Sequence, residues 1–422
     1  MKEELLQFIW RFQYFNQHEL LSEAGEPVQV LSPGELNTHQ GPDFLDAQIR
    51  IGSTLLAGAI ELHVAASDWD RHAHSGDPHY RNVILHVVWK NDRPDSAGDI
   101  PMLVLQHRIS GLLLGQYEKW MKSRSFTPCE RQLQQVPESL WAPWKQQLML
   151  QRLQRRALFI KTCLGQNRQD WEETTWWLMT RNFGLPVNGG AFEAIGKSLP
   201  VRLLARYRDE KPRLEALLLG QAGLLENDPG SAYAQLLQKE YRYLRTKHHL
   251  SAIQTPLLFL RMRPAHFPTI RLVQLAALMA AHPAWFAAIK EADSPRDLEP
   301  WLQAAADGYW DEHYTLEAKP AAPARSKVLG EGMKNSLLIN TFIPLLYAYG
   351  CLRKMPAYRD KAIRWLYAAA PEENTILKNW MRLGVTNKNA ADSQALLELK
   401  TGYCSCRKCL DCAIGKALLH SS

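Results

Sequence analysis

The chain has 422 residues, of which 46% are hydrophobic and 22% charged, so it is long enough for two or three domains with buried cores. It contains no run of about 20 apolar residues, and its first residues are acidic where a secretory signal is basic, so we expect a cytoplasmic protein without a membrane span. The net charge of +7 favours a polyanionic partner but lies below the range of dedicated nucleic-acid binders.

The N-terminal part predicts one helix followed by strands. Apolar residues recur near helical spacing in Glu3–Tyr14, which indicates an amphipathic helix. Runs rich in Val, Ile and Leu then alternate with Gly, Pro, Asp or Ser, a pattern typical of short strands. The five predicted strands are Val28–Leu31, Phe44–Ile51, Leu55–Ala65, Val83–Trp89 and Met102–Gln106. An irregular or helical insert separates the third strand from the fourth.

The rest of the chain predicts helices, because apolar residues recur every three to four positions from about residue 112 onward. The clearest examples are Leu148–Lys161, Tyr233–Arg245, Leu272–Ala281 and Ser336–Tyr349. The segment 317–326, rich in Pro and Ala, is the best linker candidate. We therefore expect an α+β protein with a core at 1–115, an α-helical region at 116–400 and a cysteine-rich tail at 401–422.

Acidic residues and a histidine are embedded in the predicted strands. Glu61 and His63 are two positions apart on one strand and project from the same face, and Asp43 begins the preceding strand. These side chains would converge across a hairpin, with Glu35 assisting from the loop after the first strand. Carboxylates prefer Mg²⁺ or Mn²⁺, and an imidazole shifts the preference toward Mn²⁺ or another transition metal. We expect Asp43 and Glu61 to hold Mg²⁺ or Mn²⁺, and His63 to act as a further ligand or as a base.

Pro42-Asp43, a gap of 17 residues and Glu61-Leu62-His63 resemble the signature of the PD-(D/E)xK nuclease superfamily. The resemblance implies a restriction-endonuclease-like α/β core, built from a helix, three strands, a helix and a strand. It also implies metal-dependent hydrolysis of phosphodiester bonds in DNA or RNA. His63 stands where the superfamily usually has a lysine that positions or activates the attacking water. Over its full length the chain resembles a bacterial domain-of-unknown-function family with the same N-terminal pattern, a helical middle and a cysteine-rich end.

A loop dense in histidines follows the third strand, within Ser67–Asn82, and His86 lies on the next strand. Polar loops beside rigid strands commonly bind ligands, so these histidines would add to the metal site, bind phosphate or close over a cleft. The residues that we expect to contact nucleic acid are His72, His74, Arg152, Arg155, Arg156 and Arg263. For the arginines, the alternative is a solvated or ion-paired helix face.

The C-terminal end carries four cysteines within nine residues, namely Cys404, Cys406, Cys409 and Cys412. Clustered thiolates suit zinc, which we expect here, or an iron–sulfur cluster as the alternative. Three of these cysteines match the first ligands of a ferredoxin-like run, but the fourth cysteine followed by proline is missing. Cys129 would complete a tetrahedral site from upstream. Some PD-(D/E)xK nucleases join an upstream cysteine to a C-terminal trio in this way, around an iron–sulfur cluster.

The sequence thus favours a metal-dependent nuclease-like protein whose partner is DNA or RNA. The main alternative is a non-catalytic module that binds nucleic acid or protein through a degenerate nuclease core, with zinc as a structural staple. A zinc metallohydrolase that uses the histidine loop ranks third, because the chain has no helical His-x-x-x-His motif.

Overall fold

The computed structural model describes residues 1–37, 39–72, 74, 77–93, 100–226, 230–260, 262–303, 305–306, 308–317, 320 and 323–420. The chain divides into two compact units, which we call unit 1 (Met1–Trp141 with Lys400–Ser422) and unit 2 (Ala142–Leu399). Unit 1 contains the main sheet and unit 2 is mostly helical, so the predicted α+β class is confirmed. The division differs from the expected boundaries, because unit 1 extends beyond residue 115 and includes the cysteine-rich tail.

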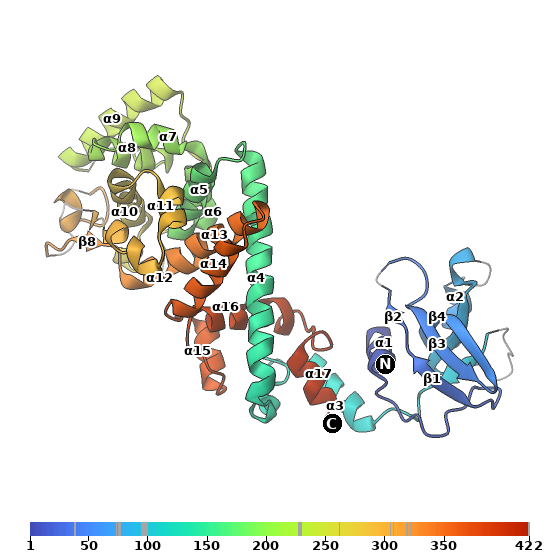
Figure 1. Ribbon diagram of the computed structural model, residues 1–422. Coiled ribbons are helices and arrows are strands. Elements are labelled where there is room, and N and C mark those ends of the chain that lie inside the picture. The colour runs from blue at the N-terminus through green and yellow to red at the C-terminus, as the bar shows by residue number, and fades with distance from the viewer. Residues whose placement is uncertain are drawn as a thin grey trace. The chain divides into compact units, whose positions relative to one another are not determined.

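Unit 1 combines a curled sheet with helices (Figure 1). Its strands are β1 (Val28–Ser32), β2 (Glu35–Leu36), β3 (Phe44–Ile51), β4 (Thr54–Ala65), β5 (Val83–Lys90) and β6 (Met102–Val104). Its helices are α1 (Glu3–Phe12), α2 (Asp68–Arg71), the 3₁₀ turns η1 (Pro78–Tyr80) and η2 (Glu130–Gln135), α3 (Gly111–Lys122) and α17 (Ala413–His420). The π-helical segment η8 (Leu399–Cys404) precedes the cysteine-rich loop. All five predicted strands and the insert after the third are present.

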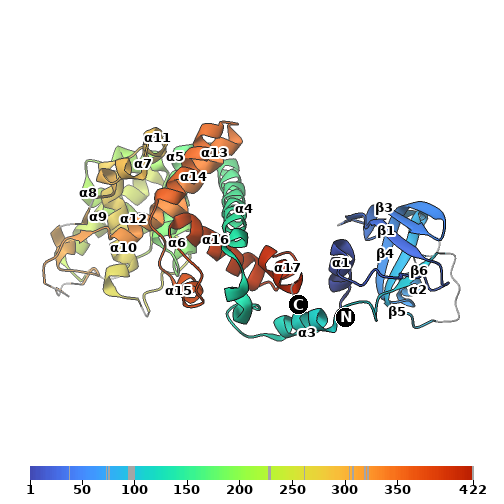
Figure 2. The same cartoon turned by 60° about the horizontal axis from the view of Figure 1, so that its bottom comes forward.

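The sheet has the order β1-β3-β4-β5-β6, and the short β2 pairs with β3. The pairs β1–β3 and β3–β4 are antiparallel, whereas β4–β5 and β5–β6 are parallel. Figure 2 shows α1 beside this sheet, where it contacts β4. Antiparallel neighbours need only a short turn, but a parallel pair needs a longer crossover, here the segment that contains α2 and η1.

The burial of β4 follows from its place in the sheet. β3 and β5 flank it, and α1 packs on it with the buried side chains of Leu6, Ile9 and Trp10. Residues Gly58–His63 are consequently all buried, including Glu61 at 5% exposure and His63 at 0%. A carboxylate and an imidazole so deeply placed need specific partners, because an unpaired polar group costs free energy away from water.

Unit 2 is a bundle of helices with one small two-stranded sheet. Its helices are α4 (Glu138–Gln166, which begins in unit 1), α5 (Trp171–Phe183), α6 (Gly189–Ser198), α7 (Val201–Arg206), α8 (Lys211–Gln221), α9 (Ala232–His248), α10 (Pro268–Ala281), α11 (Trp285–Glu291), α12 (Glu331–Leu337), α13 (Ile343–Leu352), α14 (Pro356–Ala368), α15 (Thr375–Arg382) and α16 (Ala390–Glu398). The shorter elements are η3 (Pro264–His266), η4 (Pro295–Leu298), η5 (Pro300–Gln303), η6 (Gly308–Asp311), the π-helical η7 (Leu338–Phe342), β7 (Ala305–Ala306) and β8 (Lys327–Val328).

The four clearest predicted helices are found within α4, α9, α10 and the continuous stretch from α12 to α13. That stretch, Glu331–Leu352, is long and apolar enough to cross a membrane, but 61% of its apolar window is buried inside the structure, as in a core helix. Residues 318, 319, 321 and 322 of the predicted linker lie outside the described residues.

Gly58 allows β4 and β5 to approach each other closely. A Cβ atom at this position would meet the backbone oxygen of Asn82 at 2.5 Å and Cγ2 of Ile84 at 2.6 Å. Gly58→Val should therefore force the two strands apart and lower the free energy of opening of β4 by about 1–3 kcal/mol. Hydrogen exchange of the β4 and β5 amides measures this change. Leu55→Ala on the same strand is the control, because Leu55 is 59% exposed; equal protection in both variants would contradict the prediction.

Candidate metal centre

Asp43 and Glu61 meet where β3 begins beside β4. The backbone N–H of Asp43 donates to Oε2 of Glu61 at 2.9 Å, and Oδ2 of Asp43 accepts from the backbone N–H of Leu62 at 3.1 Å. Gln7 on α1 donates from Nε2 to Oδ1 of Asp43 at 2.8 Å. Both oxygens of Asp43 and one oxygen of Glu61 therefore accept hydrogen bonds, while Oε1 of Glu61 faces histidines.

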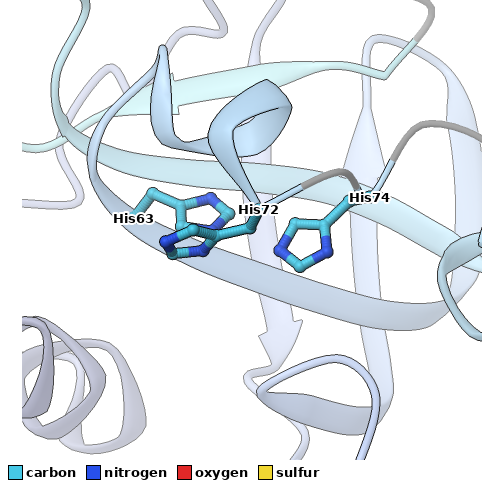
Figure 3. A group of neighbouring side chains, drawn as sticks. All are labelled: His63, His72 and His74. Carbon is cyan, nitrogen blue, oxygen red and sulfur yellow. The ribbon is translucent and has the colours of Figure 1, made fainter.

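Three imidazole rings, those of His63, His72 and His74, lie next to one another (Figure 3). Oε1 of Glu61 is 3.3 Å from Nε2 of His74 and 3.6 Å from Nε2 of His63. Nδ1 of His72 is 3.2 Å from Nε2 of His63. Each ring has one nitrogen that lies within 4.8 Å of a nitrogen of each of the other two rings. Among the described residues, these three histidines form a group of side chains close enough to share one metal ion. We call these three histidines with Glu61 the histidine cluster.

The crossover after β4 places two of these rings. Oδ2 of Asp68 accepts from the backbone N–H of Ala65 at 3.1 Å, which starts the short helix α2 at the end of the strand. His72 follows directly as the C-cap of α2. The ring of His74 stacks on Tyr80 with centroids 3.9 Å apart and meets the edge of Trp69 at 5.3 Å. Aromatic packing thus holds His74, whose Nε2 is buried and has no hydrogen-bond partner.

His86 on β5 fixes the orientation of His63. Nδ1 of His63 is 2.9 Å from Nε2 of His86, so a proton on Nδ1 would be donated to His86. That tautomer leaves the lone pair of His63 on Nε2, which is the nitrogen that faces His72 and Glu61. A histidine that binds a metal commonly donates its other ring N–H to a fixed acceptor in this way.

The ionisable groups of this region are strongly perturbed. Burial, with a contribution from Glu3, raises the pKa of Asp43 to about 7, and burial with the neighbouring Asp43 raises the pKa of Glu61 to about 8. Burial and the nearby His86 and His74 lower the pKa of His63 to about 3. The site thus disfavours both carboxylate anions and imidazolium cations, and a bound cation would stabilise the anionic and neutral ligand forms together.

The spacing of the histidine cluster fits a single metal ion. Ligand atoms arranged tetrahedrally at about 2.0–2.1 Å from a metal stand about 3.3 Å from one another. Three separations, 3.2 Å between His63 and His72, 3.3 Å between Glu61 and His74 and 3.6 Å between Glu61 and His63, are close to this value, and the nitrogens of the three histidines all lie within 4.8 Å of one another. The buried Nε2 of His74, which has no hydrogen-bond partner, is the kind of atom that a metal would satisfy. Imidazole-rich donor sets suit zinc, iron, copper or nickel better than magnesium.

A family model covers most of the chain. Residues 3–375 match the family described as "Protein of unknown function (DUF2851)". The chain belongs to this family. The matched residues include the whole histidine cluster and Cys129, and they end before the cysteines at 404–412. No curated protein and no solved structure matches the chain at a significant level.

The structure brings together part of the site predicted from the sequence. Asp43, Glu61 and His63 converge, and His72 and His74, predicted to contact nucleic acid, join them as candidate ligands. Glu35 lies on β2 with an exposed side chain, opposite Leu45 of β3. Its assisting role stays a prediction. The sequence did not distinguish His72 and His74 from other loop histidines, since their positions depend on α2 and on packing against Trp69 and Tyr80.

The arginines of α4 are engaged inside unit 2. Nε of Arg152 donates to Gln394 at 2.6 Å, and Nη2 of Arg156 donates to Asn340 at 2.6 Å. Arg155 pairs with the buried Glu398 at 2.5 Å, although its side chain is 56% exposed. Arg152, at 3.5 Å from Glu398, and Arg155 are thus ion-paired, whereas Arg156 is hydrogen-bonded to a neutral amide; their contact with nucleic acid stays a prediction. Arg263 precedes η3 with an exposed side chain, and its role stays a prediction.

The cysteines of the tail separate into two kinds. Cys409 and Cys412 are buried and Cys404 is partly buried, whereas Cys406 is exposed and its thiol contacts the backbone oxygen of Thr401 at 3.4 Å. Cys129 is buried and belongs to the same unit. This placement does not favour Cys406 as a ligand beside the other three.

Loss of a cluster histidine should weaken metal binding strongly. Replacing residues that only hold a ligand in place typically costs 10–100-fold in affinity, so His74→Ala should cost more than about 100-fold for Zn²⁺ or Mn²⁺. Competition with a chromophoric chelator measures the affinity. His79→Ala is the matched control, because His79 lies in the same crossover but its Nδ1 is bonded to Asp77 at 2.8 Å. An equal affinity in the two variants would exclude His74 as a ligand.

The contact between His63 and His86 offers a subtler test. His86→Leu removes the acceptor for Nδ1 of His63 and should lower metal affinity by about 10–100-fold. His86→Gln retains an acceptor oxygen and should retain more of the affinity. The same chelator competition compares the two variants. If Leu and Gln at this position weaken binding equally, the hydrogen bond to His63 does not orient the ligand.

Proposed function

We propose that this protein is a metal-dependent phosphodiesterase that cleaves nucleic acid, with the histidine cluster as its metal centre. The observation that carries the proposal is the convergence of His63, His72 and His74 at ligand spacing, with Oε1 of Glu61 at 3.6 Å from His63 and 3.3 Å from His74, and with Asp43 bonded to Glu61. A divalent ion bound there would lower the pKa of a bound water and neutralise charge on a phosphate, which is the chemistry of phosphodiester hydrolysis without a covalent intermediate.

The arrangement of the strands supports this choice among metal-dependent reactions. Asp43 begins β3, Glu61 and His63 lie on the antiparallel neighbour β4, and β4 then pairs in parallel with β5 after a helical crossover. The element order and the positions of the acids agree with what the resemblance to PD-(D/E)xK nucleases implies. The chain's net charge of +7 also suits a polyanionic substrate.

The contacts and exposure of each residue indicate its role in the proposed site. Glu61, His63 and His74 are buried and would bind the ion, whereas His72 is exposed and would form the side of the site that faces solvent. Asp43 accepts hydrogen bonds from Gln7 and Leu62, and its own N–H holds Oε2 of Glu61. Asp43 therefore orients Glu61 and adds negative charge that favours a cation. His63 occupies the position where PD-(D/E)xK nucleases usually have a lysine, and it acts here as a ligand. No single side chain is therefore assigned as the base that removes a proton from water.

The ligand set predicts a metal preference. The sequence alone favoured Mg²⁺ or Mn²⁺, but three imidazoles shift the preference away from Mg²⁺ toward Mn²⁺, iron or zinc. Activity with a transition metal and little activity with Mg²⁺ is therefore part of the proposal.

The decisive experiment is a cleavage assay on double-stranded DNA, single-stranded DNA and RNA with Mn²⁺, Zn²⁺, Fe²⁺ or Mg²⁺. Glu61→Gln and Asp43→Asn should reduce cleavage to the rate without metal, because Glu61 binds the ion and Asp43 orients Glu61. Asp46→Asn is the matched control, since Asp46 is an exposed carboxylate of β3 away from the cluster. Calorimetric titration of each variant with the same ion shows whether lost cleavage accompanies lost binding.

Two results would contradict the proposal. One is cleavage by Glu61→Gln and Asp43→Asn at the wild-type rate. The other is a wild-type protein that binds the ion at the cluster and cleaves none of the three substrates with any of the four metals.

That second result would favour a non-catalytic module with a structural metal centre. The specific observation in its favour is the position of His63, which is fully buried and bonded to His86 where a nuclease of this superfamily usually presents a lysine to water. Such a module would lose thermal stability, rather than activity, when a chelator removes the ion.

A further inference from the structure

Helix α9 in unit 2 carries a positively charged face. From residue 239 to residue 249 the chain has four Lys or Arg and two His, against a single acid. α9 lies beside α8 in both views of the protein, and the buried Tyr241 of α9 donates its hydroxyl to Oε1 of Gln221 on α8 at 2.7 Å (Figures 1 and 2). Because a helix repeats every 3.6 residues, the opposite side of α9 presents a set of exposed side chains, which we call the basic face: Lys239, Arg242, Tyr243 and Lys247.

The cations of the basic face are not paired with acids. The acid of this segment, Glu240, accepts from Nε of Arg213 on α8 at 2.9 Å. Within the described part of the chain, no carboxylate lies at ion-pair distance from Lys239, Arg242 or Lys247. The negative end of the helix dipole favours cations in the last turn of α9, but Lys239 and Arg242 precede that turn. Neither ion pairing nor the dipole therefore explains why these positions are cationic.

Two tyrosine rings lie next to Lys247. Its Nζ is 5.4 Å from the ring centroid of Tyr243 and 5.8 Å from that of Tyr207 at the end of α7, distances at which a cation is attracted to an aromatic face. The hydroxyl of Tyr207 is hydrogen-bonded to Nε2 of His248 at 2.7 Å, which joins the end of α7 to the end of α9. Tyr207 is buried, whereas Tyr243 is 53% exposed. Tyr243 is therefore the ring of this pair that a ligand can reach.

An exposed aromatic ring among unpaired cations suits a single-stranded nucleic acid. Lys and Arg side chains bind the phosphates of the backbone, and a tyrosine ring stacks on an unpaired base. A membrane surface is a poorer partner, because an amphipathic helix enters a bilayer through its apolar side, and the apolar side of α9, with Leu237 and Leu244, is buried within unit 2. An acidic protein segment would pair with the cations but gives Tyr243 no equivalent role.

We propose that the basic face of α9 binds single-stranded RNA or DNA, with its three cations on backbone phosphates and Tyr243 stacked on a base. This goes beyond the proposed function, since it concerns binding by unit 2 and requires neither a metal ion nor cleavage. Failure of the phosphodiesterase activity would leave this binding intact, and loss of this binding would leave the metal affinity of the histidine cluster unchanged.

The test is fluorescence anisotropy of the full-length protein with labelled oligouridine, oligothymidine and a DNA duplex of equal length, in EDTA so that no divalent ion supports cleavage. Wild-type protein should bind both single strands more tightly than the duplex. A triple variant with Lys239→Gln, Arg242→Gln and Lys247→Gln should bind more weakly and should lower the slope of log affinity against log salt by about 2, because each phosphate contact contributes about 0.7. The matched control removes the same charges from exposed positions on and after α15, with Lys378→Gln, Arg382→Gln and Lys388→Gln.

The variant Tyr243→Ala tests base stacking separately from charge. Loss of one stacked base should weaken the binding of single strands by about 5–150-fold and leave the salt slope unchanged. Tyr367→Ala, which removes a 48% exposed ring from α14, is the matched control and should retain the wild-type affinity.

Three outcomes would overturn the proposal. One is an equal affinity of the α9 triple variant and the α15 triple variant for single strands. Another is equal binding of duplex and single strands together with an unchanged affinity in Tyr243→Ala. The third is competition by polyglutamate that is as effective as competition by unlabelled oligouridine, which would assign the basic face to an acidic protein instead.

Discussion

Two neighbouring carboxyl groups, the buried Glu61 and the half-buried Asp43, are the constraint on which the rest of the N-terminal site depends. Asp43 and Glu61 lie on neighbouring strands; burial with a contribution from Glu3 raises the pKa of Asp43 to about 7, and burial with the neighbouring Asp43 raises the pKa of Glu61 to about 8. Removing one charge from water costs several kcal/mol unless a partner compensates it. Backbone N–H groups and Gln7 compensate three of the four oxygens, and the fourth is left to the histidines. A cation there would satisfy the remaining oxygen and the imidazoles at once.

The change from antiparallel to parallel pairing at β4 explains why histidines surround that oxygen. A parallel pair requires the chain to leave the end of β4, cross over and return at the start of β5. The crossover begins three residues after His63, so its first turn, α2, lies next to that ring and places His72 and His74 beside it. The same topology therefore buries Glu61 on a central strand and places the candidate ligands His72 and His74 next to it. Apart from α1, the residues of the site come from β3, β4, β5 and the crossover between β4 and β5.

Local patterns were sufficient to predict the strands, the shared face of Glu61 and His63 and the position of Asp43, because the alternation of side chains along a strand is a property of neighbouring residues. The pairing of Arg156 with Asn340 could not be predicted, since the two are 184 positions apart and a helix with many arginines is equally consistent with a solvated face. The approach of His72 and His74 to His63 depends on Asp68, Trp69 and Tyr80, whose packing is tertiary. Similarly, spacing within the tail made Cys406 look equivalent to its neighbours, and only burial separates them.

The two donor sets of unit 1 differ in a way that would sort metal ions. The histidine cluster combines imidazoles with one carboxylate, a borderline set that accepts several divalent metals, whereas the cysteines of unit 1, Cys129 and those of the tail, offer only thiolates, which are soft and favour iron–sulfur centres or zinc.

A metal bound at either donor set would also affect the chain differently. Glu61, His63, His72 and His74 come from one stretch of 14 residues, so an ion there orders a local crossover. Cys129 and Cys404 are 275 positions apart, and a shared metal centre would close a loop that contains all of unit 2. Because the entropy of loop closure grows with loop length, a metal held by both Cys129 and Cys404 would stabilise the chain more than an ion held by the histidine cluster.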